Sequence, residues 1–277
     1  MPMTSRPVRL VCAAAAASCL SLALGVSAGA QNGPSQACPN ESQPPLLGTA
    51  GNDTLNGTAA ADRMVAGDGD DVVNALQGDD CVRGGDGFDV ITGASGADLI
   101  FGEDGPDDLS GDRGDDRLFG GEGFDFLSGG LGDDELAGEG GPDDIGGGRG
   151  NDRIDGGEGE DFLEGGLGTD IMRGRDGDDD LAGGFDRDFI SGGDGDDRLA
   201  GGFGNDSLTG DAGDDRLQGG DGRNVYLAGD GNDVVDSANG VRETRVNCGR
   251  GRDTVRADAN DRVRGCERVF RLMRTRR

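Results

Sequence analysis

A strict nine-residue period runs through most of this sequence. Counted in nines from Gly48, each unit reads Gly-Gly-x-Gly-x-Asp-x-apolar-x, and residues 192–200 (GGDGDDRLA) are a clean copy. The register continues to Asp236 without an insertion or a deletion, which gives 21 units over 189 residues. Only Asn224 departs from aspartate at the sixth place. A period this regular predicts a repeat architecture.

The period also predicts what each unit folds into. Glycines at the first, second and fourth places give the backbone the freedom that a tight turn needs. The last three places are long enough only for a short strand, whose single apolar side chain points inward. Two units make a coil of 18 residues, and stacked coils pair parallel strands about 4.8 Å apart. We therefore expect an all-β parallel solenoid, or β-roll, of about 10.5 coils and about 50 Å in length.

The nine-residue unit resembles the hemolysin-type, or RTX, calcium-binding nonapeptide repeat, and the resemblance covers about two thirds of the chain. It implies a parallel β-roll in which the Asp carboxylates of one loop and of the loop one coil further on hold a calcium ion together. Backbone carbonyls of the glycine-rich turns would complete an all-oxygen shell, which suits a hard divalent cation. The metal ligands implied by the resemblance are the sixth-place aspartates: Asp53, Asp62, Asp71, Asp80, Asp89, Asp98, Asp107, Asp116, Asp125, Asp134, Asp143, Asp152, Asp161, Asp170, Asp179, Asp188, Asp197, Asp206, Asp215 and Asp233.

The net charge of the repeat array indicates that its folding needs a cation. Residues 48–236 hold 12 arginines and 49 acidic residues, a net charge of −37, in a chain with a net charge of −29. This repulsion favours an expanded chain, and one apolar residue in nine offers little hydrophobic stabilisation against it. If loops one coil apart share an ion, 21 loops give at most about 19 Ca²⁺ sites. We therefore expect calcium binding and folding to be one event, with a largely disordered metal-free state.

Some loops depart from the pattern, and we expect weaker sites there. Ala60 and Ala61 stand where the second turn favours glycine, and Asp186 replaces the fourth-place glycine of its unit. Asn224 brings no formal charge to the ligand position. The best sites are expected between Gly84 and Gln218.

Composition restricts the chemistry that remains. The chain contains no histidine and no tryptophan, and no lysine occurs in it. A Ser-His-Asp or Cys-His mechanism, a histidine-bearing zinc site and a Schiff-base lysine are therefore excluded. Paired carboxylates could support glycosidase-type chemistry, but their regular sixth place in the repeat already has a structural explanation. We expect no enzyme activity.

The N-terminus predicts export. Arg6 and Arg9 precede an apolar run over residues 10–26, and Ala28-Gly29-Ala30 forms a small-residue cleavage site, the format of a secretory signal peptide. The run is too short to favour a permanent membrane anchor, so no membrane insertion of the mature chain is expected. We divide the chain into a signal peptide (1–30), a linker or N-terminal clip (31–47), the RTX β-roll (48–236) and a C-terminal cap with a basic tail (237–277).

Cysteine spacing agrees with an oxidising, extracellular destination. Removal of the signal peptide leaves Cys38, Cys81, Cys248 and Cys266. Cys248 and Cys266 are 18 residues apart, which is one coil, and a disulfide tolerates that spacing. A Cys38–Cys81 bond follows by elimination and would clip the linker onto the fourth repeat. Four free thiols are the alternative, which an exported protein disfavours.

The C-terminal segment reverses the charge of the chain. Residues 237–277 hold 12 arginines and 5 acidic residues, a net charge of +7. We interpret the segment as a cap that closes the exposed edge of the roll, followed by a frayed tail. The alternative is a basic hook for anionic envelope polymers or nucleic acid, with Arg271, Arg274, Arg276 and Arg277 at its tip. No aromatic residue lies between the arginines of this tip (271–277) for base stacking, so no nucleic-acid binding is expected.

These patterns together predict an exported calcium-binding β-roll with a structural or adhesive extracellular role. A cell-envelope glycan or a matrix component is a candidate partner. The phenylalanines avoid the inward eighth place, so Phe101, Phe119, Phe126, Phe162 and Phe189 are expected on the outer faces. The alternative is a polysaccharide-binding module similar to the repeat modules of alginate epimerases. Such a module would favour a basic groove, whereas this array is acidic.

Overall fold

The structure, a computed structural model, describes residue 38 and residues 44–241 and 245–272. The expected signal peptide (1–30) and most of the expected linker lie outside these residues, as do Arg274, Arg276 and Arg277 of the basic tail. The described residues form strands and turns, and none of them lies in a helix long and apolar enough to cross a membrane.

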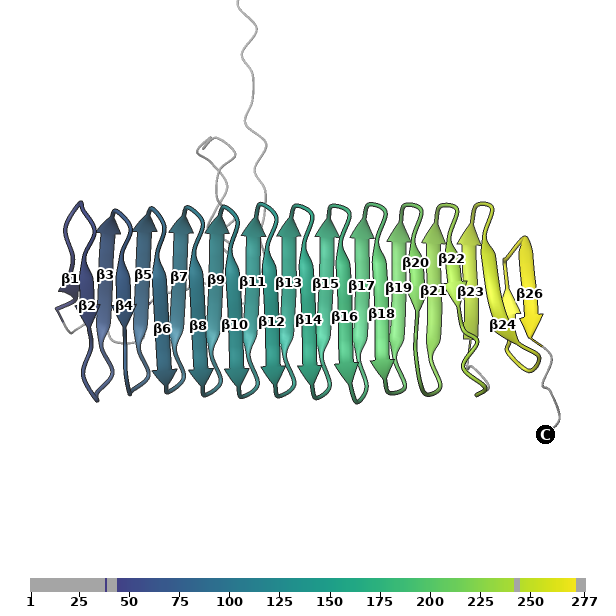
Figure 1. The fold of residues 1–277 in the computed structure, drawn as a ribbon, viewed down its shortest axis with the longest axis horizontal. Helices are drawn as coiled ribbons and strands as arrows, with labels where there is room; N and C mark the ends of the chain where they lie inside the picture. The colour runs from purple at the N-terminus through teal and green to yellow at the C-terminus, as the bar shows by residue number, and fades with distance from the viewer. Residues whose placement is uncertain (1–37, 39–43, 242–244, 273–277) are drawn as a thin grey trace, which may run out of the picture. The chain divides into compact units, whose positions relative to one another are not determined.

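Two parallel sheets of 13 strands each make up the described chain, and successive strands alternate between them (Figure 1). Sheet A contains β1 (Leu46–Leu47), β3 (Arg63–Asp68), β5 (Cys81–Asp86), β7 (Leu99–Asp104), β9 (Arg117–Glu122), β11 (Glu135–Gly140), β13 (Arg153–Glu158), β15 (Ile171–Asp176), β17 (Phe189–Asp194), β19 (Ser207–Ala212), β21 (Val225–Asp230), β23 (Arg245–Arg250) and β25 (Val263–Arg264). Sheet B contains β2 (Thr54–Asn56), β4 (Val72–Asn74), β6 (Val90–Ser95), β8 (Asp108–Arg113), β10 (Phe126–Leu131), β12 (Asp144–Arg149), β14 (Phe162–Leu167), β16 (Asp180–Phe185), β18 (Arg198–Phe203), β20 (Arg216–Gln218), β22 (Val234–Asp236), β24 (Thr254–Asp258) and β26 (Arg268–Leu272). The expected all-β parallel solenoid is confirmed.

The register follows the sequence period. Up to the pairing of β20 with β22, each strand pairs with the strand 18 residues further on, as Leu127 with Ile145, so equivalent places of successive coils lie side by side. Beyond it the offset changes, as between Val225 and Arg245. Most strands are six residues long because they continue through the first three places of the next unit. Most turns then have a left-handed residue at the fourth place. Gly150 has a φ of 145°, and a side chain there would collide with the carbonyl of Gly132 one coil back.

Asp186 shows that this turn geometry does not depend on glycine alone. It stands at the fourth place of its unit and adopts a left-handed φ of 73°. The next coil still pairs in register at Phe185 and Phe203. The backbone pairing on both sides therefore holds an unfavourable conformation in place.

The core is a single file of side chains between the two sheets. Every eighth-place residue from Leu55 to Val235 is buried in one continuous cluster, as expected. Val246 and Val255 extend the cluster beyond the last regular repeat. In most units a first-place glycine adds no side chain to this interior, whereas Ala66, Ala75 and Ala228 at the same place are buried in the cluster as well.

The solenoid extends past both ends of the nine-residue array, which accounts for its about 12 turns. At the N-terminal end, β1 pairs with β3. At the C-terminal end, β23 to β26 continue both sheets rather than folding across them. Cys248 and Cys266 form the expected disulfide, with Cα atoms 5.3 Å apart, and so tie the last coil to the one before it.

The second disulfide anchors an N-terminal residue to the outer surface of sheet A. Cys38 is bonded to Cys81, as expected, with a Cα–Cα distance of 5.6 Å. Leu99 and Phe101 are buried in the same small cluster, against which Phe119 packs. Phe101 does point away from the core, but the expectation that it would be exposed is wrong because this cluster covers it. Phe126, Phe162 and Phe189 are exposed as expected.

Candidate metal centre

The sixth-place aspartates line the two edges of the roll, one in each turn. The glycine-rich turn bends every chain segment so that the carboxylate lies under it, immediately before a strand begins. Asp134, for example, precedes β11, and Asp152 precedes β13, its neighbour in sheet A. From Asp71 onward, all the sixth-place aspartates are buried, with at most 3% of their surface exposed. Carboxylates are almost never buried to this degree unless they are paired.

One oxygen of each carboxylate is held by the backbone. The N–H of Asp134 donates to Oδ1 of Asp152 at 2.9 Å, and the N–H of Asp152 donates to Oδ1 of Asp170 at 2.8 Å. The same bond recurs along both edges. At the C-terminal end the N–H of Asp253 donates to Glu267 Oε2 at 2.8 Å, so a glutamate ends the ladder. Each loop is thereby fixed against the loop one coil away.

The other oxygen has no such partner. In the described part of the chain, Oδ2 of 19 buried aspartates accepts no hydrogen bond: Asp71, Asp80, Asp89, Asp98, Asp107, Asp116, Asp125, Asp134, Asp143, Asp152, Asp161, Asp170, Asp179, Asp188, Asp197, Asp206, Asp215, Asp233 and Asp253. The ion pairs formed among these residues of the roll use other acidic side chains. A buried ionised carboxylate with an unsatisfied oxygen is strongly unfavourable, so the arrangement calls for a cation.

A small space bounded by oxygens lies beside most of these atoms, wherever the first place of the unit is glycine. A Cβ added to Gly147 would lie 2.5 Å from Oδ2 of Asp152 and 2.8 Å from the carbonyl oxygen of Gly165 in the next coil. At Gly201 the corresponding distances are 2.5 Å to Asp206 Oδ2 and 2.7 Å to the Gly219 carbonyl oxygen. First-place glycine thus keeps open a cradle between a carboxylate of one coil and a carbonyl of the next.

The donor set fits a hard divalent cation. Carboxylate and carbonyl oxygens are the ligands of Ca²⁺, and the chain supplies no nitrogen or sulfur ligand at these positions. Among residues 44–241 and 245–272, no group of three or more acidic or cysteine side chains could hold a metal. A calcium ion held here would therefore be bound by one or two carboxylates together with backbone carbonyls, as the sequence resemblance implies.

Burial raises the pKa of several sixth-place aspartates. Desolvation raises the pKa of Asp107, Asp116 and Asp143 to about 7, the accepted backbone hydrogen bond lowers it in part, and neighbouring carboxylates raise it further. A bound cation would act in the opposite direction by favouring the ionised form. Protons and metal ions therefore compete for the same oxygens.

The first two expected ligands differ from the rest. Asp53 and Asp62 are half-buried, and their Oδ2 atoms accept hydrogen bonds from threonines at the second place. Thr49 donates to Asp53 from its backbone N–H at 2.6 Å and from its hydroxyl at 2.7 Å. Thr58 does the same for Asp62 at 2.6 and 2.8 Å. These two turns satisfy their carboxylates without a cation, in agreement with weaker sites at the N-terminal end.

The turn over residues 219–224 has neutral hydrogen-bonding groups where most other turns have a buried carboxylate. Asn224 Oδ1 keeps the ladder by accepting the Asp206 N–H at 2.8 Å. The amide of Asn239 donates to the carbonyls of Gly220 and Gly222 at 2.7 and 2.9 Å. The Tyr226 hydroxyl accepts the Gly219 N–H at 3.1 Å from inside the core. This turn therefore carries its own donors.

Asp253 is a ladder residue that the nine-residue count does not identify. It is fully buried, and its Oδ1 accepts the Asp233 N–H at 3.1 Å. Twenty residues separate this pair rather than 18, so the longer connection shifts Asp253 out of frame. The sequence signal was present, because Gly249 and Gly251 precede Asp253 at turn-like spacing and Val255 follows it at the core spacing.

At the basic end of the chain, Arg271 packs back onto the fold. It donates from Nη1 to the carbonyl oxygens of Asp258 and Asp261 at 2.8 and 3.3 Å. Within the described residues, this arginine is thus engaged in closing the last coil and is not the free tip of a hook.

Comparison with protein families identifies the repeats. The family model of the RTX calcium-binding nonapeptide repeat matches residues 47–80, 77–109, 110–145, 138–172, 173–208 and 201–235. These segments span the regular array and the aspartate rows described above. No curated protein matches the chain with significance.

The raised carboxylate pKa values predict an unusual response of the metal-free protein to acid. The unfolded carboxyl titrates near 3.8 and several folded ones near 7, so stability is fully present below about pH 4 and is lost as the pH rises through 7. In chelator, we expect the β signal in circular dichroism to increase from pH 8 to pH 5. In calcium the signal should persist at pH 8, and the apparent calcium affinity should fall as the pH is lowered. A metal-free protein with no more β structure at pH 5 than at pH 8 would contradict this account.

The amide-held turn predicts a separation of stability from calcium binding. Asn239→Ala removes the donor to two carbonyls, so we expect a loss of about 1 to 3 kcal/mol in the free energy of unfolding. The number of bound calcium ions should not change. Urea denaturation and equilibrium dialysis measure the two quantities, and Asn56→Ala on β2 is the control. A lower calcium stoichiometry in Asn239→Ala would show that this turn does hold metal.

Proposed function

Because this chain belongs to the RTX calcium-binding nonapeptide repeat family, we propose that calcium drives its folding and that the folded roll serves as an exported structural or adhesive element. Calcium binding by the repeats is the premise. The coupling to folding, the number of sites and the extracellular role are the proposal. Its main support is the row of buried aspartate Oδ2 atoms that lack a partner.

The chain's own residues prepare each site in three ways. The backbone N–H of one loop orients the carboxylate of the next by binding Oδ1, as Asp116 does for Asp134 at 2.8 Å. The first-place glycine leaves the space beside Oδ2 open. Burial under the turn excludes water, which strengthens attraction to a cation and makes an empty site unfavourable. When bound, Ca²⁺ would supply two positive charges and accept oxygen ligands at about 2.3 to 2.6 Å.

The charge of the roll supports a high number of ions. Up to about 19 shared sites would bring a charge of roughly +38 against the −37 of residues 48–236. The loops from Gly84 to Gln218 all keep the buried carboxylate, including Asp188, which follows the irregular Asp186. Most of the bound ions would therefore lie in this region.

Two further features favour an extracellular, non-enzymatic role. Both disulfides belong to an oxidising compartment, in agreement with the signal peptide expected from residues 1–30. The absence of histidine and lysine from the sequence leaves few groups for acid–base or nucleophilic catalysis. A rigid calcium-loaded roll fits a spacer or matrix component better than a catalyst.

Two neighbouring aspartate pairs provide a matched test of the sites. Asp116→Asn with Asp134→Asn keeps the Oδ1 acceptors but removes the buried charges. Asp115→Asn with Asp133→Asn removes the same charge from exposed loop positions one residue away. We expect the first variant to bind about two or three fewer calcium ions and to need several-fold more calcium for the transition to β structure. The second should bind as many ions as the parent protein.

Equilibrium dialysis and circular dichroism during a calcium titration give both readouts, with magnesium as the ion control. Equal calcium stoichiometry in the two variants would show that the buried aspartates are not the ligands. If the first variant binds fewer calcium ions but its folding transition does not shift, the buried aspartates are ligands but calcium binding is not coupled to folding. That result would contradict the proposed coupling.

A further inference from the structure

The outer surface of sheet B carries an order that the nine-residue period does not require. Residues 106–141 and 142–177 are two copies of a 36-residue unit, both beginning Pro-Asp-Asp. Because a coil contains 18 residues, the longer unit makes alternate strands of one sheet alike. The outward side chains of β8, β10, β12 and β14 therefore alternate between two kinds.

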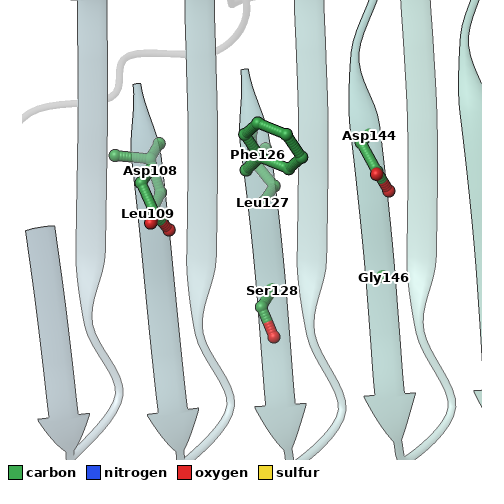
Figure 2. Close-up of a pocket in the computed structure, with 7 residues that line it drawn as sticks. All are labelled: Asp108, Leu109, Phe126, Leu127, Ser128, Asp144 and Gly146. Atoms are coloured by element: carbon green, nitrogen blue, oxygen red, sulfur yellow. The ribbon is translucent and has the colours of Figure 1, made fainter. Parts of the chain in front are cut away.

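Two rows of side chains cross these four strands, and we call them together the strip. The first row, near the start of each strand, is Asp108, Phe126, Asp144 and Phe162. The second row, near the end of each strand, is Arg113, Leu131, Arg149 and Leu167. One type of strand thus carries Asp and Arg, and the other carries Phe and Leu. Figure 2 shows the first row, with Asp108, Phe126 and Asp144 side by side on adjacent strands.

Within the chain, Phe126 contacts the ring of Phe124 edge to face, with ring centroids 5.0 Å apart, but the strip is otherwise left exposed. Phe126 and Phe162 are 46% and 45% exposed, and Leu131 and Leu167 are 44% and 39% exposed. Among the described residues, no ion pair or side-chain hydrogen bond involves the charged members of the strip. On sheet A, by contrast, charged side chains pair between neighbouring strands, as Arg117 does with Glu135 at 3.5 Å. A flat surface with regularly spaced apolar side chains and unpaired charges is typical of an interaction site.

We propose that this strip is the docking surface for a second copy of the chain. A two-fold axis parallel to the roll, midway between the rows, brings the first row of one copy onto the second row of the other. Asp144 then faces Arg149 of the second copy, and Phe162 faces its Leu167. The same exchange pairs Asp108 with Arg113 and Phe126 with Leu131, so every contact occurs twice, as an isologous interface requires.

The alternative orientation is unfavourable. With the two-fold axis along the strands through β12, Asp144 would face its own copy and Arg149 would face its own copy. Like charges in direct opposition oppose association. Of these two arrangements, the pattern of the strip favours the first, in which the two rolls run side by side in the same direction.

The surface between the rows permits close approach. On β10 and β12 it carries small residues such as Ser128, Gly146 and Gly148, and nothing lies within 4 Å of a Cβ built on Gly146. On β14 it carries the exposed Glu164, which would lie near Glu164 of the second copy, a contact that the four Asp–Arg pairs must outweigh. A groove of about 460 Å³ beside Phe126 is bounded by Asp108, Ser128, Asp144 and Gly146 (Figure 2). A bulky side chain from the facing copy can enter this groove.

Neighbouring strands enlarge the contact. Phe185 on β16 and Phe203 on β18 continue the second row and stack with ring centroids 5.1 Å apart. Arg198 on β18 would face Phe203 of the second copy, a favourable cation–π pair. Six strands of six residues cover about 29 by 20 Å, or about 1,150 Å² over both copies. That area lies at the lower end for specific complexes, so the dimer should be reversible.

A charge-swap experiment tests this arrangement in calcium. We expect the parent chain to dimerise in sedimentation velocity between about 10 and 300 µM. Asp144→Arg and Arg149→Asp should each weaken dimerisation by at least about 100-fold, because each places like charges opposite one another twice. An equimolar mixture of the two single variants should form a heterodimer, and the double variant should dimerise like the parent. Recovery in the mixture rules out misfolding as the cause of the loss.

A second pair of variants tests the apolar contacts. Phe162→Asp should abolish dimerisation, whereas Phe189→Asp, which changes an equally exposed ring on sheet A, should not. The inference rests on the proposed function only in that calcium must fold the roll. Circular dichroism separates the two, because a missing β signal would count against the proposed function. A folded parent chain that stays monomeric at 300 µM, or single charge variants that dimerise like the parent, would overturn the proposed dimer.

Discussion

A buried carboxylate with only one oxygen satisfied is the unit on which this structure depends. Most turns hold Oδ1 of an aspartate with a backbone N–H and leave Oδ2 facing a small cradle of oxygens. Repeated along both edges of the roll, this arrangement makes the metal-free fold electrostatically unfavourable at neutral pH. Under the proposed function, calcium binding would turn the same feature into the main source of stability, since a cation shared between loops would tie neighbouring coils together. The thin core, with one inward side chain per unit, then has only to exclude water and set the register.

The exceptions in the row support this interpretation. Where the turn provides its own donors, the carboxylate or its replacement has a partner. Thr49 satisfies Asp53 at the N-terminal end, and Asn239 supplies the amide at the turn over residues 219–224. Both lie toward the ends of the nine-residue array. The disulfides reinforce the same regions. The ends of the roll are thus held by ordinary hydrogen bonds and covalent links, whereas the central coils are the part for which we propose calcium dependence.

Much of this could be predicted from the sequence because the period is short and strict. Aspartate at the sixth place and an apolar residue at the eighth define the turn, the strand and the core without reference to distant contacts. The same count failed at Asp253, since a connection two residues longer moved it out of frame. It also failed at Phe101, which is buried by Cys38 and its neighbours rather than by its own repeat. The hydrogen bonds from threonine hydroxyls to Asp53 and Asp62 could not be predicted from the sequence either, because they depend on how each hydroxyl is oriented in the folded turn. The nine-residue period determines where the turns, strands and core residues lie. Tertiary contacts decide whether an individual side chain is buried and which hydrogen bonds it makes.

The central claim is that the carboxylate rows prevent compaction until a divalent cation binds. Small-angle X-ray scattering of the purified protein at pH 7.5, with excess chelator and then with calcium, tests it most directly. The account predicts an expanded coil in chelator and a narrow rod in calcium, with magnesium unable to replace calcium. A chelated protein that scatters as the same compact rod would contradict it.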